Sequence, residues 1–187
     1  MKKLTLIFAV LLAFVFVLPS VSEARRNEKE GTVEEVEALL NSHQIGVWVE
    51  GEVFGDLLLG TRGRIDLVYI DDKMSDAIGS VRTLPVWFDD LNQYHGSEKA
   101  EKKALFFVQL DVHKPWKFDI KSMKIGDYSV KDEDIVTGSW RNPEGELPSE
   151  SKWTFAFAVP EKYVKKNRNK VIKISYGKDA VEWKVPR

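Results

Sequence analysis

The chain has 187 residues, a formal net charge of −1 and a hydrophobic content of 43%. This balance is typical of an ordinary globular protein and excludes a disordered chain. The near-zero net charge argues against recruitment of nucleic acid or of an anionic membrane by the field of the whole molecule. No cysteine is present, which excludes disulfides, thiolate metal ligands and cysteine nucleophiles.

Residues 1–24 have the pattern of a secretory signal peptide. A basic start at Lys2 and Lys3 precedes an apolar run over residues 4–18, and residues 22–24 place small side chains at both cleavage-recognition positions. The alternative is an uncleaved membrane anchor, but this run is shorter than the roughly 20 residues that a spanning helix needs. We therefore predict a secreted or periplasmic protein, cleaved after Ala24, with no stable membrane insertion afterwards.

A short helix is predicted at the start of the folded part. Residues 25–31 are charged and lack apolar side chains, so we expect a flexible spacer there. Thr32 and Glu35 match a capping box, and apolar residues then follow at helical spacing. The helix covers about residues 32–42 and belongs to a single domain, residues 32–187. His43 follows it, where a cation is favourable beside the carbonyl end.

From Ile45 onward the apolar period changes to two, which is the period of β-strands. Residues 45–53 and 64–69 predict two strands that pair. Leu57 to Leu59, between them, form either a buried plug or a small exposed patch, and we favour the plug. Pro85 assigns residues 83–90 to an extended segment at a sheet edge. Residues 104–112 predict a central strand because of their apolar density.

The C-terminal third carries the strongest strand signals. In residues 153–159, large side chains at Trp153, Phe155, Phe157 and Val159 alternate with small ones, which predicts a strand in the middle of a sheet. A tight turn at Gly126-Asp127 joins two further strands, and residues 172–185 form a hairpin that turns at Gly177. About nine short strands with turn signals between them predict an all-β fold, a mostly antiparallel β-sandwich with one short N-terminal helix.

The order of these signals over about residues 104–187 resembles secreted bacterial immunoglobulin-like domains of unknown function. The resemblance rests on the strand at 105–112, the Gly126-Asp127 turn, the Gly-Glu-Leu-Pro sequence at 145–148 and the final strand pair. It implies an immunoglobulin-like β-sandwich and assigns no functional residue. The chain departs from antibody domains because it lacks the cysteines of the inter-sheet disulfide.

Catalytic and metal-binding patterns are weak in this sequence. His43, His95 and His113 are isolated, and no Gly-x-Ser-x-Gly turn is present. We therefore expect no enzymatic activity, with a hydrolase as the third possibility. No glycine-rich phosphate loop or cluster of histidines supports a cofactor or metal. The acidic groups at residues 71–76 and 132–134 lack EF-hand spacing, so we interpret them as solvated turn carboxylates.

One segment has a local charge asymmetry. Six cations within twelve residues are balanced only by Glu161: Lys162, Lys165, Lys166, Arg168, Lys170 and Lys173. Such a segment can bind the acidic face of a protein or an anionic envelope component. The alternative, which we favour for the segment alone, is a solubilising connector with Tyr163 and Val164 folded onto the sandwich.

Tryptophans raise a second binding hypothesis, because flat rings stack on sugars. Trp153 and Trp183 fall in the core register, whereas Trp48 falls on the polar face of its strand. Near strand ends lie Trp87, Trp116 and Trp140. If exposed, they form a glycan-stacking surface, and if buried, they fill the ends of the sandwich.

The sequence thus predicts an exported, non-enzymatic binding or accessory protein whose partner is a protein or an envelope component. The alternative is a carbohydrate-binding module that uses Trp87, Trp116 and Trp140. The possible partner-binding residues are Lys162, Lys165, Lys166, Arg168 and Lys170.

Overall fold

The computed structural model describes residues 32–54, 57–81, 84, 86–143 and 145–187. The predicted signal peptide and spacer lie outside these residues. The chain is mostly β, with 39% strand and 28% helix, and its sheets are antiparallel. This confirms the coarse prediction of a mostly β, antiparallel fold.

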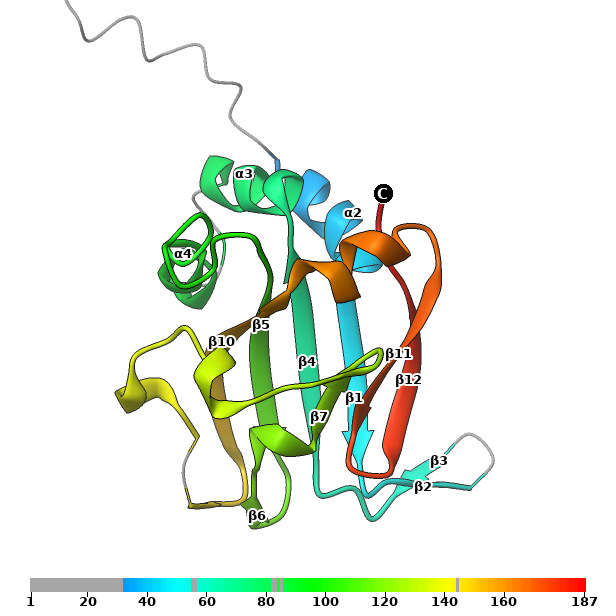
Figure 1. Cartoon of the computed structure of the whole chain (residues 1–187). Coiled ribbons are helices and arrows are strands. Elements are labelled where there is room, and N and C mark those ends of the chain that lie inside the picture. Colours follow the sequence, from blue (N-terminus) through cyan, green and yellow to red (C-terminus); the bar gives the residue numbers. More distant parts are fainter. Residues whose placement is uncertain (1–31, 55–56, 82–83, 85, 144) are drawn as a thin grey trace, which may run out of the picture. The chain divides into compact units, whose positions relative to one another are not determined.

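The first sheet has four strands in the order β1-β4-β5-β10 (Figure 1). They are β1 (Gln44–Val49), β4 (Gly63–Ile70), β5 (Lys103–Val112) and β10 (Ser151–Pro160). The predicted pairing of the first two strands is correct, with Val47 opposite Ile65. The strand predicted to be central, β5, lies between β4 and β10.

The second sheet has the order β12-β11-β7-β8. Its strands are β12 (Asp179–Lys184), β11 (Val171–Tyr176), β7 (Met123–Ile125) and β8 (Tyr128–Ser129). The predicted C-terminal hairpin and the turn at Gly126 are both present. The chain passes from β5 in the first sheet to β7 in the second, returns to β10 and continues to β11, so the sheets interlock.

The main core lies between the two sheets. Alternate residues of β5, including Phe106, Val108 and Leu110, contribute to it as predicted, and Phe155 and Phe157 of β10 add large rings. Trp183 of β12 packs edge-on against Tyr69 and Phe106. Burial of these apolar side chains is the principal source of stability.

Helices cover part of the other face of the first sheet, which gives the described domain a third layer (Figure 1). Helix α2 (Val33–His43) has the predicted capping box between Thr32 and Glu35. Helix α3 (Asp72–Ser80) buries Met74 and Ile78. Helix α4 (Val86–Asn92) buries Leu91, and Ser75 Oγ bonds Asn92 Oδ1 at 3.0 Å to join α3 to α4.

The predicted N-terminal helix is present, but α3 and α4 were not predicted, and the expectation of an extended segment at 83–90 is wrong for residues 86–90. The sequence Val-Trp-Phe starts α4, and a proline just before a helix is as favourable as one on a strand edge. Asp71 is not a solvated turn residue, because it is the N-cap of α3 and accepts a bond from the Met74 amide at 2.9 Å. Asp72 and Asp76 are exposed as predicted, but they lie in α3 rather than in a turn.

The predicted central position of residues 153–159 was also wrong, because β10 is the last strand of its sheet. Its free edge is partly covered by the segment at Ile135, which forms a bridge with Phe157, and the Val136 amide bonds the Ala156 carbonyl at 2.9 Å. The small residues Ala156 and Ala158 are buried in the layer between sheet and helices. Both faces of this strand are therefore covered over residues 155–159, which explains the continuous apolar pattern there.

Two short antiparallel pairs complete the described strands. One joins β2 (Glu52–Phe54) to β3 (Leu57–Leu59), and the other joins β6 (Trp116–Lys117) to β9 (Glu146–Leu147). The side chains of Leu57 to Leu59 lie outside the described part, so the choice between plug and patch stays open.

Candidate functional site: a basic segment beside a charged pocket

The basic segment connects β10 to β11 through two 3-10 turns, η4 (Glu161–Tyr163) and η5 (Lys165–Asn167). Val164 between them is fully buried, and Tyr163 packs against Tyr128 with ring centroids 4.9 Å apart. This anchoring is what the solubilising-connector alternative predicted. It leaves every candidate cation exposed, namely Lys162, Lys165, Lys166, Arg168 and Lys170.

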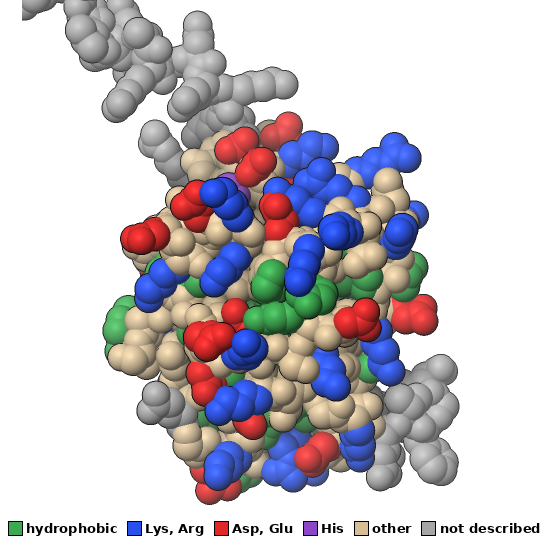
Figure 2. Space-filling view, in the orientation of Figure 1, with side chains coloured by type: hydrophobic (Ala, Val, Ile, Leu, Met, Phe, Trp, Pro, Cys, Tyr) green, Lys and Arg blue, Asp and Glu red, His purple; other side chains and the backbone are tan. Residues whose placement is uncertain are grey.

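These cations are poorly neutralised by the rest of the protein. Lys165 pairs with Glu161, but among the described residues no carboxylate lies within 4 Å of Lys166 or Lys170 in an ion pair. Figure 2 shows Lys and Arg side chains gathered at the upper right of this face. The positive charge is therefore available for an anionic group from outside.

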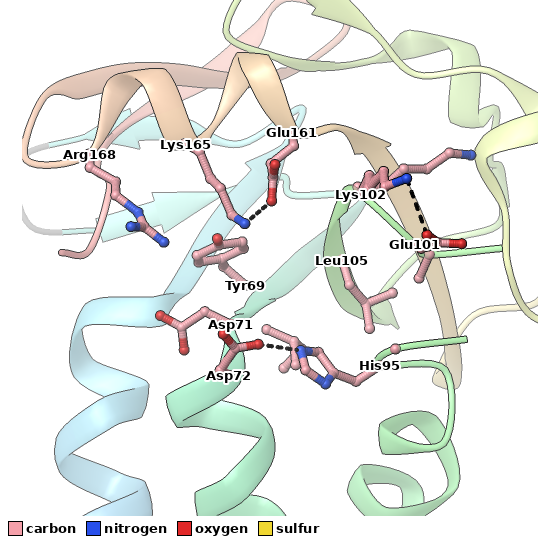
Figure 3. Close-up of a pocket in the computed structure, with 14 residues that line it drawn as sticks. Tyr69, Asp71, Asp72, His95, Glu101, Lys102, Leu105, Glu161, Lys165 and Arg168 are labelled. Carbon is pink, nitrogen blue, oxygen red and sulfur yellow. Dashed lines mark ion pairs between the residues drawn. The ribbon is translucent and has the colours of Figure 1, made fainter. Parts of the chain in front are cut away.

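A pocket of about 200 Å³ opens beneath this segment (Figure 3). Its walls come from the end of β4, the start of α3, the turns at residues 95–103 and the η4–η5 segment. Its charged lining residues carry both signs: Asp71, Asp72, Glu101, Glu161, Lys102, Lys103, Lys165 and Arg168. Lys165 and Arg168 of the basic segment thus belong to both the surface and the pocket.

Tyr69 lies between the acidic and basic walls of the pocket. Burial raises the pKa of its hydroxyl, and the negative charge of Asp71 raises it further, whereas the Arg168 guanidinium lowers it. The hydroxyl therefore stays protonated near neutral pH and can donate a hydrogen bond. Figure 3 shows Arg168 directed toward Tyr69.

Asp71 connects the pocket to a buried histidine. His43 Nε2 lies 3.3 Å from Asp71 Oδ2, and its ring stacks on Tyr69 with centroids 5.9 Å apart. The two atoms are close, but Nε2 forms no aligned hydrogen bond. Burial alone raises the pKa of Asp71, but His43, the Met74 amide and Lys73 together hold it below its ordinary value.

Ser42, His43 and Asp71 form a continuous series of contacts that superficially resembles a catalytic triad. Ser42 Oγ lies 2.9 Å from His43 Nδ1, but Nδ1 also lies 2.8 Å from the carbonyl oxygen of Leu39. A carbonyl oxygen only accepts, so Nδ1 carries a hydrogen and cannot take the serine proton. The arrangement favours the end-of-helix role that the sequence predicted for His43.

The other two histidines lie in separate places. His95 lines the pocket, with Nε2 3.4 Å from Asp72 Oδ1 (Figure 3). His113 lies beside Trp48, with ring centroids 6.0 Å apart. The sequence did not point to the pocket, because Tyr69, His95 and Arg168 are distant in the chain and meet only through the fold.

The tryptophans of the glycan hypothesis have different environments. Trp116 is 3% exposed and packs against Phe118 and Tyr176, so it is not available for stacking on a sugar. Trp140 is 76% exposed, with the Arg141 guanidinium 4.6 Å from its ring centroid. The side chain of Trp87 lies outside the described residues. Trp116 is therefore a core residue, and it is excluded from the predicted glycan-stacking residues.

Two carboxylates interpreted as solvated turn residues are in fact integrated in the fold. Asp71 caps α3, and Asp134, in η2 (Asp132–Asp134), is buried and accepts bonds from the Tyr128 hydroxyl and the Lys131 amide. Within the described ranges, no cluster of three or more potential metal ligands is found. Over the same residues, no helix is both long and apolar enough to cross a membrane.

Comparison with protein-family models, with curated proteins and with solved structures finds no match to this chain. The geometry and charge of the described residues are therefore the basis for a functional proposal.

Proposed function

We propose that the protein is an exported, non-enzymatic binding protein that recognises an acidic protein or envelope component through residues 162–170. The exposed and largely unpaired cations of this segment carry the proposal. Charges of one sign on an ordered surface attract an anionic partner and increase the association rate.

The backbone of the segment is held in place, which favours binding. Buried Val164 fixes its middle, and the Asn167 side chain bonds the Tyr163 carbonyl at 2.9 Å. At its end, the Asn169 amide bonds the Val185 carbonyl and the Val185 amide bonds the Lys170 carbonyl, both at 3.0 Å. A surface already ordered loses less conformational entropy when a partner binds.

The pocket supports binding more than catalysis. Its Asp71 and Lys165 are engaged with His43 and Glu161, respectively, and its histidine, His95, faces Asp72. These paired groups position one another. Arg168 and the Tyr69 hydroxyl line the same cavity (Figure 3), as does Lys103. We infer that the pocket receives a single anionic side chain or head group of the bound partner.

Charge reversal of the unpaired lysines tests this function. We expect Lys166→Glu with Lys170→Glu to weaken co-sedimentation with a purified envelope fraction of the producing cells at least tenfold. The matched control is Lys117→Glu with Lys124→Glu, because both lysines are exposed and the net charge changes equally. Binding that is insensitive to salt, or equal losses in both double variants, would contradict the proposal.

We further propose that the two interlocked sheets form an immunoglobulin-like sandwich. The support is the chain path, which crosses between sheets so that β5 pairs with β10 and β7 pairs with β11. An experimental structure in which these strands lacked Greek-key connections would contradict this finer assignment.

A further inference from the structure

The outer face of the first sheet is divided into two halves. In register across β1, β4, β5 and β10, one row consists of Trp48, Arg64, Asp111 and Lys152. The next row on the same face consists of Gly46, Asp66, Gln109 and Thr154. We refer to these two rows as the open polar face.

The following rows change character on the three strands that continue beneath the helices. Val68, Phe107 and Ala156 align across β4, β5 and β10, and they belong to the core covered by α2, α3 and α4. In Figure 1 the helices lie at the upper end of the sheet, and the strands continue below them. On all three strands the outer-face residues change from polar to apolar at the same register position, and this position marks the edge of the helix layer.

The side chains of the open polar face are accessible. Trp48 is 39% exposed, and the side chains of Arg64 and Lys152 are 37% and 67% exposed. Three interstrand spacings give this row a width of about 14 Å. The surface therefore has room for an extended ligand that lies across the strands.

Trp48 and Arg64 are held in a defined arrangement. The Arg64 guanidinium lies 5.0 Å from the centroid of the Trp48 ring, and its Nη2 pairs with Asp66 at 2.8 Å. A Cβ at Gly46 would come within 2.9 Å of Arg64 Nη2, so the glycine makes room for the guanidinium. Such restraint reduces the entropy lost when a ligand binds.

The charges on this face balance one another. Arg64 pairs with Asp66, and Lys152 lies 3.9 Å from Asp111, which leaves no net charge on the four groups. Arg64 Nε has no hydrogen-bond partner but is buried, so the groups open to a ligand are those of the ion pairs and the amide of Gln109, which can both donate and accept. A charged partner would have to displace these ion pairs, whereas a neutral polyhydroxyl ligand bonds to them as they stand.

We propose that the open polar face binds a neutral oligosaccharide, with a sugar ring stacked on Trp48 and hydroxyl groups bonded to Arg64, Gln109 and Asp111. An indole ring offers a flat apolar surface to the C–H groups of a pyranose. Planar guanidinium, amide and carboxylate groups can form paired hydrogen bonds with neighbouring hydroxyl groups of a sugar. This site is independent of the basic segment, because it lies on the opposite face of the first sheet from the core shared with β11.

Calorimetric titration of the purified exported protein with cellohexaose and with chitohexaose tests the site. We expect at least one hexasaccharide to bind, with an affinity unchanged by salt because the ligand is neutral. Trp48→Ala should weaken binding at least tenfold, Trp48→Tyr should retain part of it, and Gln109→Ala should reduce it without loss of an aromatic ring. Thermal unfolding of each variant verifies that it is folded.

Two controls separate this site from other surfaces. Trp140→Ala removes a more exposed tryptophan outside the two rows, and the Lys166→Glu, Lys170→Glu double variant removes the basic surface. Both should bind the hexasaccharide as the unmodified protein does. The proposal is overturned if neither hexasaccharide binds at millimolar concentration, if Trp48→Ala and Gln109→Ala leave binding intact, or if Trp140→Ala abolishes it.

Discussion

Asp71 stabilises two helix ends with one carboxylate. It caps the N-terminus of α3 through the Met74 amide and contacts buried His43 at the C-terminus of α2. Asp71→Asn retains a capping side chain and removes the charge, whereas Asp71→Ala removes both. We expect Asp71→Ala to lower the free energy of unfolding by about 1 kcal/mol more than Asp71→Asn, the usual worth of an N-cap. Urea denaturation of the two variants measures the difference, and equal values would rule out the cap as a stabilising contact.

The same carboxylate predicts a pH dependence. Its pKa is lowered from the ordinary value of 3.8, so its ionised form is stabilised by folding, and that stability is lost as the pH falls through the folded-state pKa. The difference in unfolding free energy between the unmodified protein and Asp71→Asn should be largest above about pH 5 and shrink below about pH 4. A difference that grows on acidification would contradict this assignment.

Helices α3 and α4 depend on a small number of buried contacts. Ile78 is fully buried on α3, while Asp76 on the same helix is exposed. We expect Ile78→Ala to cost about 2–5 kcal/mol, because it leaves a cavity against the sheet. Asp76→Ala should change stability by less than about 0.5 kcal/mol. Chemical denaturation provides both values, and a small effect at Ile78 would show that the helix layer is loosely packed.

Some helices and strands could be predicted from the sequence and others could not, for physical reasons. The apolar density of β5 indicated its central place, the alternation in the β11–β12 hairpin specified its faces, and the Thr32–Glu35 capping box located α2. Helix α3 was missed because its buried stripe is only Met74 and Ile78. For α4, the sequence Val-Trp-Phe is compatible with either a strand or a helix, and packing on the sheet decides between them.

The candidate sites were partly predictable from the sequence. The basic segment was found because its charges are contiguous in the chain. The pocket and the open polar face were not found, because each combines residues from several strands. The placement of Arg64, Asp111 and Lys152 in one row depends on strand order and register, which local sequence does not encode.

At the scale of the whole molecule, Trp183 links all the layers. Its ring packs on Tyr69 and Phe106 of the first sheet, and its Nε1 donates to the Ser42 carbonyl in α2 at 3.0 Å. We expect Trp183→Phe to cost about 1 kcal/mol for the lost hydrogen bond. Trp183→Ala should cost about 3–5 kcal/mol, since the ring is also lost. Thermal or chemical unfolding distinguishes the two, and near-equal losses would show that the hydrogen bond dominates.

The predicted export concerns the whole chain. If residues 1–24 are a signal peptide, the protein recovered outside the cytoplasm should begin at Arg25. Intact mass measurement and N-terminal sequencing of the recovered protein test this expectation. Recovery of a species that retains residues 4–18 would indicate the membrane-anchor alternative instead.

The first and last strands of the described domain meet, since β1 contacts β12 and the Glu50 amide bonds the Asp179 carboxylate at 2.9 Å. Contacts between residues so distant in sequence close only after a long loop has been ordered, so they slow folding. The sheet-to-sheet core cannot be completed until β12 has left the ribosome. We therefore expect the sheet-to-sheet core to stay incomplete until β12 has been made, and an incompletely folded chain is the form that an unfolded-chain export pathway can thread across a membrane.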